Sequence, residues 1–248
     1  MEGKGFFTKE IEEALLNNDV DLAIHSHKDL ETTYPDGLTI SAVPQRTFVE
    51  DLLLIRKEST ADNAVFDIKP DAVIGTSSAR RKTQLKHHLP TCQTKDLRGN
   101  VPTRVNKLRE GQYDAIVLAK AGVTRLELDL SDLHVVDLPA DSFVPAPAQG
   151  ALAVQTREDD SVLNEHLSKL NNTHVQKQVN VERTLLKELQ GGCQLPFGAY
   201  CHLEDEAWKL HVAIAKDADA QATYFHLEGN DPDALLQEML PKIKSIHS

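Results

Sequence analysis

Long apolar runs are absent from this sequence of 248 residues. No segment approaches the roughly 20 apolar residues that a membrane-spanning helix needs, and the start, Met1-Glu2-Gly3-Lys4-Gly5, is not followed by the apolar stretch of a signal peptide. Cysteine is also scarce. Cys92, Cys193 and Cys201 are too few and too scattered for a disulfide framework, and no pair has the CxxC spacing of a zinc site. We therefore expect a cytoplasmic protein with no membrane partner and no metal.

Positive charge is in deficit over the whole chain. The formal net charge of −11 argues against general nucleic-acid binding, because that mode needs a positive surface to displace counterions. The segment from Thr76 to Arg109 reverses this balance, since only Asp96 opposes its nine cations. Such a concentration indicates either a site for a small anionic ligand or a solvated helix face. The nine cations are Arg80, Arg81, Lys82, Lys86, Lys95, Arg98, Arg104, Lys107 and Arg109.

Strand and helix patterns alternate along most of the chain, which implies parallel strands with crossover helices. Three prolines within residues 139–147 indicate an inter-domain connection, and the last part alternates differently, as an α+β module. The expected helices are 8–18, a helix after Ser78 to about 88, 101–110, 162–170, 174–189 and 232–246. The expected strands are 20–24, 38–43, 52–55, 72–74, one ending near 96, 115–118, 151–155, 199–204, 207–214 and 222–227.

One loop after a strand concentrates donors for an anion. Gly75-Thr76-Ser77-Ser78 precedes a helix whose first turn carries Arg80 and Arg81. Free backbone N–H groups at a helix start bind anions, hydroxyl groups add donors, and guanidinium forks grip carboxylates two oxygens at a time. The alternative is an ordinary capped surface helix.

A second loop, Leu97-Arg98-Gly99-Asn100-Val101-Pro102-Thr103-Arg104, has similar features. Gly-Asn predicts a turn and Pro102 suits the first turn of a helix, so Arg98 would end a strand and Arg104 would lie on the helix. Loops at the carboxyl ends of neighbouring parallel strands face one crevice. Together the two loops favour a carboxylate pocket.

The polar run His25-Ser26-His27-Lys28-Asp29 also closes a strand. Asp29 could hold positive charge on a substrate nitrogen or shuttle protons, although an aspartate at a strand end is also a common turn residue. His25 and His27 have no evident third ligand, so a metal is not expected there.

A thiol lies in the glycine- and proline-rich loop from Gln190 to Gly198. Such a loop can present the sulfur of Cys193 for covalent attachment, whereas the alternative is a small buried residue. Cys92, inside an expected strand, and Cys201 are predicted to lie in the core.

Taken together, these segments resemble the porphobilinogen deaminase (hydroxymethylbilane synthase) family over almost the whole chain. The matching segments are Gly3 to Glu10 with GKGLF-x-KE, Ile24 to Asp29 with HS-x-KD, Gly75 to Arg81 with GTSS-x-RR, Leu97 to Arg104 with LRGN-x-x-TR, Pro147 to Ala151, and Gly191 to Pro196 with GGCQ-x-P. The resemblance implies an α/β fold with two domains like those of periplasmic binding proteins, with parallel or mixed sheets, and a small α+β domain. The implied domains are 1–46 with 144–168, 47–143, and 169–248.

The resemblance also implies a transferase that acts as a monomer on a small molecule. It would condense four porphobilinogen molecules, with loss of ammonia, into hydroxymethylbilane. Cys193 would carry a dipyrromethane cofactor through a thioether bond, and Asp29 would be the catalytic carboxylate. Lys28, Ser78, Arg80, Arg81, Arg98 and Arg104 would bind the cofactor, and Lys4, Thr76, Arg125 and Gln149 the substrate.

The sequence departs from the family pattern at several points. The resemblance begins after the strand and helix that carry an R-x-S-P-L-A-type motif in the family, and without that piece apolar surface and strand edges of the first domain would be uncovered. His27 replaces an apolar residue, and Glu31 replaces a proline. An inactive homologue and a non-catalytic small-anion binding protein on the same scaffold therefore remain as alternatives.

Overall fold

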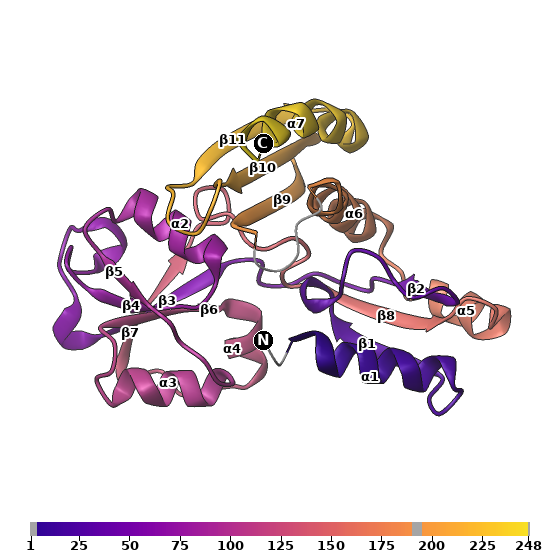
Figure 1. Cartoon of the computed structure of the whole chain (residues 1–248), viewed down its shortest axis with the longest axis horizontal. Coiled ribbons are helices and arrows are strands. Elements are labelled where there is room, and N and C mark those ends of the chain that lie inside the picture. Colours follow the sequence, from indigo (N-terminus) through magenta and orange to yellow (C-terminus); the bar gives the residue numbers. More distant parts are fainter. Residues whose placement is uncertain (1–3, 190–194, 248) are drawn as a thin grey trace.

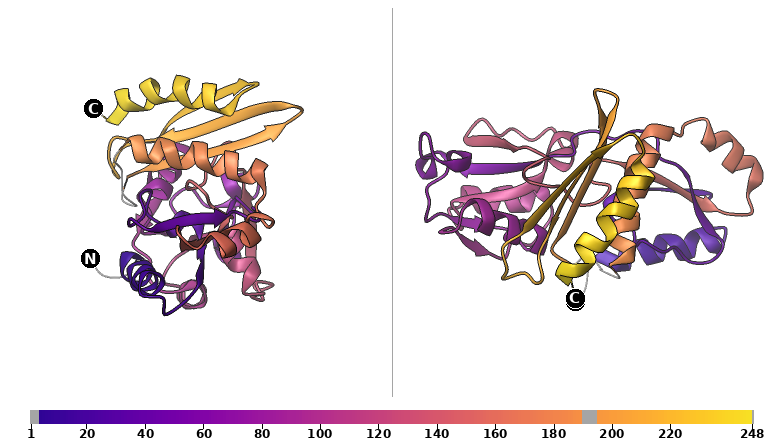
Figure 2. Two further views of the ribbon diagram at one scale, coloured as in Figure 1. Left: turned by 90° about the vertical axis from the view of Figure 1, so that its right-hand side faces the viewer. Right: turned by 90° about the horizontal axis from the view of Figure 1, so that it is seen from above.

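The computed structural model describes residues 4–189 and 195–247 of the chain. These residues form three sheets, and helices pack on each of them (Figure 1). Each sheet and the helices packed on it form one unit of the fold. The third sheet and its last helix lie across the junction between the other two units (Figure 2). In this described part, none of the helices combines the length and the apolarity that crossing a membrane requires.

The first sheet has the strand order β1-β8-β2, and its central strand is antiparallel to both neighbours. The prediction of parallel strands is wrong here, because β8 returns from far along the chain and separates β1 from β2. Leu15 of the first helix packs on Ala23 and Leu38 of this sheet. On the edge strand β1, Leu22 and Ile24 are 37% and 64% exposed. The elements are α1 (Lys4–Leu16), β1 (Leu22–Ser26), β2 (Leu38–Ala42), β8 (Leu152–Arg157) and α5 (Ser161–Ser168).

The second sheet has five strands in the order β5-β4-β6-β3-β7 and is mixed. The predicted parallel pairing is confirmed for β4 with β5 and β6, whereas β3 is antiparallel to β6 and β7. Leu53 and Ile55 of β3 enter one core cluster and Leu52 and Leu54 the other, so the apolar run of this strand is buried on both faces. The elements are β3 (Asp51–Arg56), β4 (Val73–Gly75), α2 (Ala79–His88), β5 (Gln93–Lys95), α3 (Val101–Arg109), β6 (Ala115–Ala119), and the unpredicted α4 (Lys120–Arg125) and β7 (Leu133–Leu138).

The third sheet is antiparallel, in the order β11-β10-β9, as expected for an α+β module. The helices α6 and α7 share one core with a face of this sheet, in which Trp208 and Leu210 are buried. Cys201 is fully buried there, as predicted, whereas Cys92 lies in a turn before β5 and is only partly buried. The elements are α6 (Thr173–Glu188), β9 (Phe197–Glu204), β10 (Ala207–Ile214), β11 (Thr223–Gly229) and α7 (Pro232–His247).

Two backbone segments, 43–50 and 143–151, connect the first and second sheets. They run side by side, since Arg46 forms an isolated bridge with Ala151 and the N–H of Thr47 donates to the carbonyl of Gly150 at 3.2 Å. Gly150 has a φ of +85°, and a Cβ atom there would lie 2.4 Å from the Thr47 carbonyl oxygen. Only glycine fits this close crossing.

Candidate active site

A buried carboxylate holds the two arginines at the start of α2. Asp51 is fully buried, and Arg80 and Arg81 are 5% and 7% exposed. Asp51 Oδ2 accepts from Arg80 Nη2 at 2.8 Å and from Arg81 Nε at 3.2 Å, and Asp51 Oδ1 accepts from Arg81 Nη2 at 2.7 Å. Burial alone would raise the pKa of Asp51, but the two guanidinium groups hold it well below its usual value.

The same arginines also bind backbone carbonyls. Arg80 Nη1 donates to the carbonyl of Val144 and Arg81 Nη1 to that of Val117, both at 2.9 Å. The sequence pattern suggested forks that point to a ligand, yet much of their donor capacity goes to Asp51 and the backbone. No motif in the sequence indicates Asp51, although it is a charged residue directly before the apolar run of β3.

Gln149 links the Asp51 carboxylate to the turn that contains Lys28 and the predicted catalytic residue Asp29. Its Nε2 donates to Asp51 Oδ1 at 2.9 Å and to the carbonyl of Val49 at 2.8 Å, and its Oε1 accepts from Lys28 Nζ at 3.3 Å. Burial lowers the pKa of Lys28 to about 8; the charge of Arg81 also lowers it, while Asp29 raises it. The structure therefore brings Lys28 into the electrostatic field of both Asp29 and the α2 arginines.

Asp29 ends a short 3₁₀ turn, η1 (His27–Asp29), that continues β1. The turn is held from α6, because Arg183 Nη1 donates to the carbonyls of His27 at 3.0 Å and Leu30 at 3.2 Å. The N–H of His27 donates to the carbonyl of Ala151 at 3.0 Å. These contacts hold the backbone of the turn that carries Asp29, and no motif in the sequence indicates Arg183.

Arg104 is another predicted cation near this group. Burial lowers its pKa, and the charge of Arg81 lowers it further, which indicates that the two guanidinium groups are neighbours. Arg104 Nε donates to the carbonyl of Gly99 at 2.6 Å. Arg80, Arg81, Lys28 and Arg104 are four cations, and Asp51 and Asp29 are two carboxylates, so this group carries two positive charges in excess.

The other predicted site residues differ in how near they lie. Thr76 is buried and its Oγ1 accepts from the N–H of Ser78 at 3.3 Å. Arg98 is exposed on the second loop, and Arg125 is exposed at the end of α4. Lys4 begins α1. Cys193 lies outside the described residues.

The predicted cationic segment is partly neutralised by anions of its own unit. Lys82 pairs with Asp96 at 2.7 Å, and Arg109 pairs with Asp132 at 2.7 Å, both at the surface. These pairs offset two of the nine cations of the segment.

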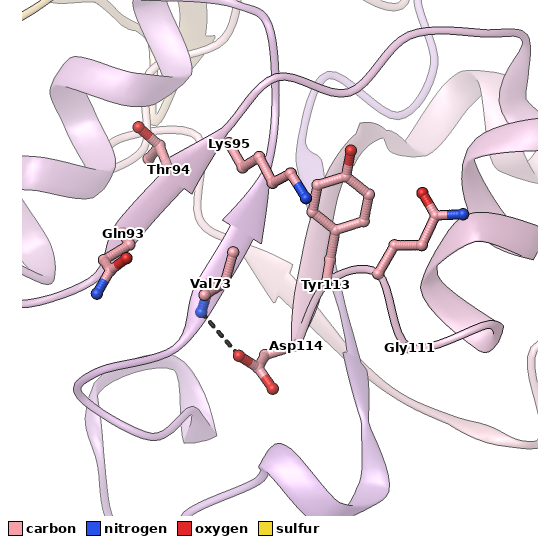
Figure 3. Close-up of a pocket in the computed structure, with 8 residues that line it drawn as sticks. Val73, Gln93, Thr94, Lys95, Gly111, Tyr113 and Asp114 are labelled. Atoms are coloured by element: carbon pink, nitrogen blue, oxygen red, sulfur yellow. Dashed lines mark hydrogen bonds between the residues drawn. The ribbon is translucent and has the colours of Figure 1, made fainter.

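A pocket of about 440 Å³ in the second unit lies apart from this group (Figure 3). Val73 and Gln93 begin β4 and β5, and residues 111–114 precede β6, so the pocket opens at the amino ends of the parallel strands. Asp114 there accepts from the N–H of Val73 at 2.8 Å and from Ser59 Oγ at 2.8 Å. The α2 arginines follow the opposite, carboxyl end of β4.

His27 makes the η1 turn sensitive to acid. It is 2% exposed, and burial, followed by the charges of Arg183 and Arg46, lowers its pKa to about 3. The unfolded chain binds a proton at this residue below pH 6.5, whereas the folded chain does so only near pH 3. Stability is therefore lost as the pH falls from 6.5 toward 3.

His27 should account for about 2 kcal/mol of the stability that the protein loses between pH 8 and pH 5, because pH 5 lies 1.5 units below the unfolded pKa of 6.5 and each unit corresponds to about 1.36 kcal/mol. We expect His27→Met to abolish this part of the loss. Urea unfolding at the two pH values measures this. His174→Gln, at an exposed position of α6, is the control and should leave the pH dependence unchanged. An equal loss of stability in His27→Met and in the unaltered protein would exclude His27 as the source.

Comparison with known proteins agrees with these features. A family model described as "Porphobilinogen deaminase, dipyromethane cofactor binding domain" matches residues 1–165, and one described as "Porphobilinogen deaminase, C-terminal domain" matches residues 176–240. The porphobilinogen deaminase of Geobacillus kaustophilus is 42% identical over 94% of this chain and 74% of its own length. That of Streptococcus sanguinis is 39% identical over 97% of this chain and 78% of its own length.

Among solved structures, an ancestral cationic amino acid solute binding protein matches with a TM-score of 0.43 and 19% identity, over 65% of this chain and 66% of its own. The periplasmic VFT2 domain of BvgS from Bordetella pertussis matches with a TM-score of 0.40 and 16% identity, over 66% of each chain. The sequence relatives and the two family models, which follow one another along the chain, establish the relationship. The chain belongs to the porphobilinogen deaminase family.

Proposed function

We propose that this chain is a transferase of tetrapyrrole biosynthesis that condenses four porphobilinogen molecules into hydroxymethylbilane, as a monomer in the cytoplasm. The observation that carries the proposal is one series of contacts. It runs from Lys28, next to Asp29, through Gln149 to Asp51 and the α2 arginines. This series joins the η1 turn, which follows the first sheet, to the arginines of α2, which packs on the second.

The charge of this group fits a dipyrromethane cofactor. Pyrroles of this type carry acetate and propionate side chains, and two excess positive charges in a partly buried region favour binding of carboxylates. When bound through Cys193, the cofactor would supply the pyrrole carbon to which the first substrate is joined. Lys28, Ser78, Arg80, Arg81, Arg98 and Arg104 are the residues proposed to hold it.

Asp29 is proposed to act on the nitrogen side of the bound pyrroles. A carboxylate there stabilises positive charge that develops on pyrrole nitrogens, and it accepts and returns protons within a short reach. Its turn is held by Arg183 through backbone carbonyls, which fixes the backbone that carries the carboxylate. Lys28 is mostly an ammonium at neutral pH, because its pKa is about 8, and so can bind a substrate carboxylate.

The remaining predicted residues complete the proposal for the substrate. Lys4, Thr76, Arg125 and Gln149 would contact porphobilinogen, and Gln149 already lies against Lys28. The proposed domains are 1–46 with 144–168, 47–143, and 169–248, so that the substrate site lies where the first two meet.

Replacing Cys193 tests the cofactor directly. The purified chain should have the mass of its polypeptide plus one dipyrrole, and Cys193→Ser should have the mass of its polypeptide alone and no transferase activity, since serine cannot form the thioether. Cys92→Ser, at a partly buried turn residue, is the matched control and should keep the added mass. An unmodified chain that consumes no porphobilinogen would contradict the proposal, and a pyrrole on Cys193→Ser would show that another sulfur is used.

A further inference from the structure

The proposed reaction assigns no role to Asp51. It is the first residue of β3 and is fully buried. Its two oxygens accept the three arginine hydrogen bonds described above and a fourth from Gln149. A buried ion pair is weak evidence for stability, because desolvation of the charges offsets much of their attraction. Four donors from two different segments converge on this carboxylate, which suggests a role in arranging them.

The carboxylate fixes which way the amide of Gln149 points. An ionised carboxylate only accepts hydrogen bonds, and the carbonyl of Val49 is also an acceptor. Both face Nε2, at 2.9 and 2.8 Å, so Oε1 must face the opposite way. There it accepts from Lys28 Nζ at 3.3 Å. A flipped amide would direct its N–H groups at an ammonium and its oxygen at two acceptors.

We propose that Asp51 is a positioning residue that orients both α2 arginines and, through the amide of Gln149, the ammonium of Lys28 beside Asp29. This inference rests on the proposed function of the site. It deepens that function, because one group on the second sheet then sets the arrangement of cations on both the η1 turn and α2.

The charges around Lys28 show why Asp51 matters to it. The charged groups that act on Lys28 are Asp29 on its own turn, Asp51 on β3, and Arg80 and Arg81 on α2. The two carboxylates favour its charged form and the two arginines disfavour it. Loss of the Asp51 charge would leave the arginines uncompensated, and Lys28 would lose its proton at a lower pH.

The test measures the titration of Lys28 itself. Trace labelling with acetic anhydride over a pH series, read by peptide mass spectrometry, gives the pH at which Lys28 is half reactive. In Asp51→Asn this midpoint should fall by about one pH unit, as expected for loss of an opposite charge at close range. The basic limb of kcat/KM for porphobilinogen should move in the same direction, and KM should rise more than kcat falls.

Two further variants keep the test decisive. Gln149→Met leaves Asp51 with both arginines but cuts the connection to Lys28, so it should lower the midpoint even if Asp51→Asn does not fold. Asp114→Asn removes a carboxylate of the same unit that contacts Val73 and Ser59, and should leave the midpoint unchanged. An unchanged midpoint in Gln149→Met, or in folded Asp51→Asn, overturns the inference.

Labelling needs neither porphobilinogen nor the cofactor, so the two proposals fail separately. A shifted midpoint in a chain that consumes no porphobilinogen would support the arrangement set by Asp51 and contradict the proposed function. Conversely, a chain that consumes porphobilinogen normally, but whose variants leave the Lys28 midpoint unshifted, would support the proposed function and contradict the arrangement set by Asp51.

Discussion

Asp29→Asn is expected to lower the turnover of porphobilinogen by about 10²-fold or more, while the midpoint of thermal unfolding stays the same. Asparagine keeps the shape of the side chain but has no negative charge and cannot accept a proton at neutral pH. The fold should be retained, because Arg183 and Ala151 hold the turn through backbone groups. Steady-state rates and circular dichroism measure the two quantities.

A neighbouring carboxylate provides the control for this variant. Glu31 is exposed two residues further on, and its backbone carbonyl rather than its side chain binds Arg183. Glu31→Gln should therefore turn over at the normal rate. Normal turnover in Asp29→Asn would remove the proposed role of Asp29, and an equal loss in both variants would point to the general charge of this turn.

Glu182→Gln should reduce the free energy of unfolding by about 3–5 kcal/mol, because it leaves a buried guanidinium without its counter-charge. Glu182 is fully buried, and its two oxygens accept from Arg46 at 2.6 and 3.0 Å. They also accept from the N–H groups of Ala148 at 2.7 Å and Cys201 at 2.8 Å. One carboxylate thus joins both connecting segments to the third sheet.

Thermal unfolding provides the measurement, with an expected fall of about 10 °C for a chain of this size. Glu188→Gln is the matched control on the same helix, since its ion pair with Lys244 is exposed and should contribute less than about 1 kcal/mol. A fall of similar size in both variants would show that Glu182 has no special place at the junction.

Local patterns predicted most of the helices and strands. The α6 helix, expected at 174–189, is found at Thr173–Glu188, and the β10 strand, expected at 207–214, has those bounds. Periodicity reports which face of an element is buried, and this was enough for amphipathic helices and alternating strands. The short helix α4 and the edge strand β7 were not predicted, because neither shows a long periodic run.

Strand order and counter-ions could not be derived in the same way. The pairing of β8 with β1 joins Ala153 to His25, far apart in the sequence, and no local feature specifies such a partner. Likewise the run around Arg80 and Arg81 indicates an anion but does not say that the anion is Asp51. The motifs located the two loops and the Lys28–Asp29 turn, whereas their connection through Gln149 is a property of the tertiary structure.

The place of β8 in the first sheet has a consequence for folding during synthesis. β1 and β2 do not pair with each other, and each hydrogen bonds only to β8 among the strands of that sheet. All of the second sheet lies between β2 and β8 in the chain, so it emerges from the ribosome before β8 does. The pairing of β1 and β2 with β8 therefore forms only after residues 152–157 have been made, later than all the strands of the second sheet have emerged.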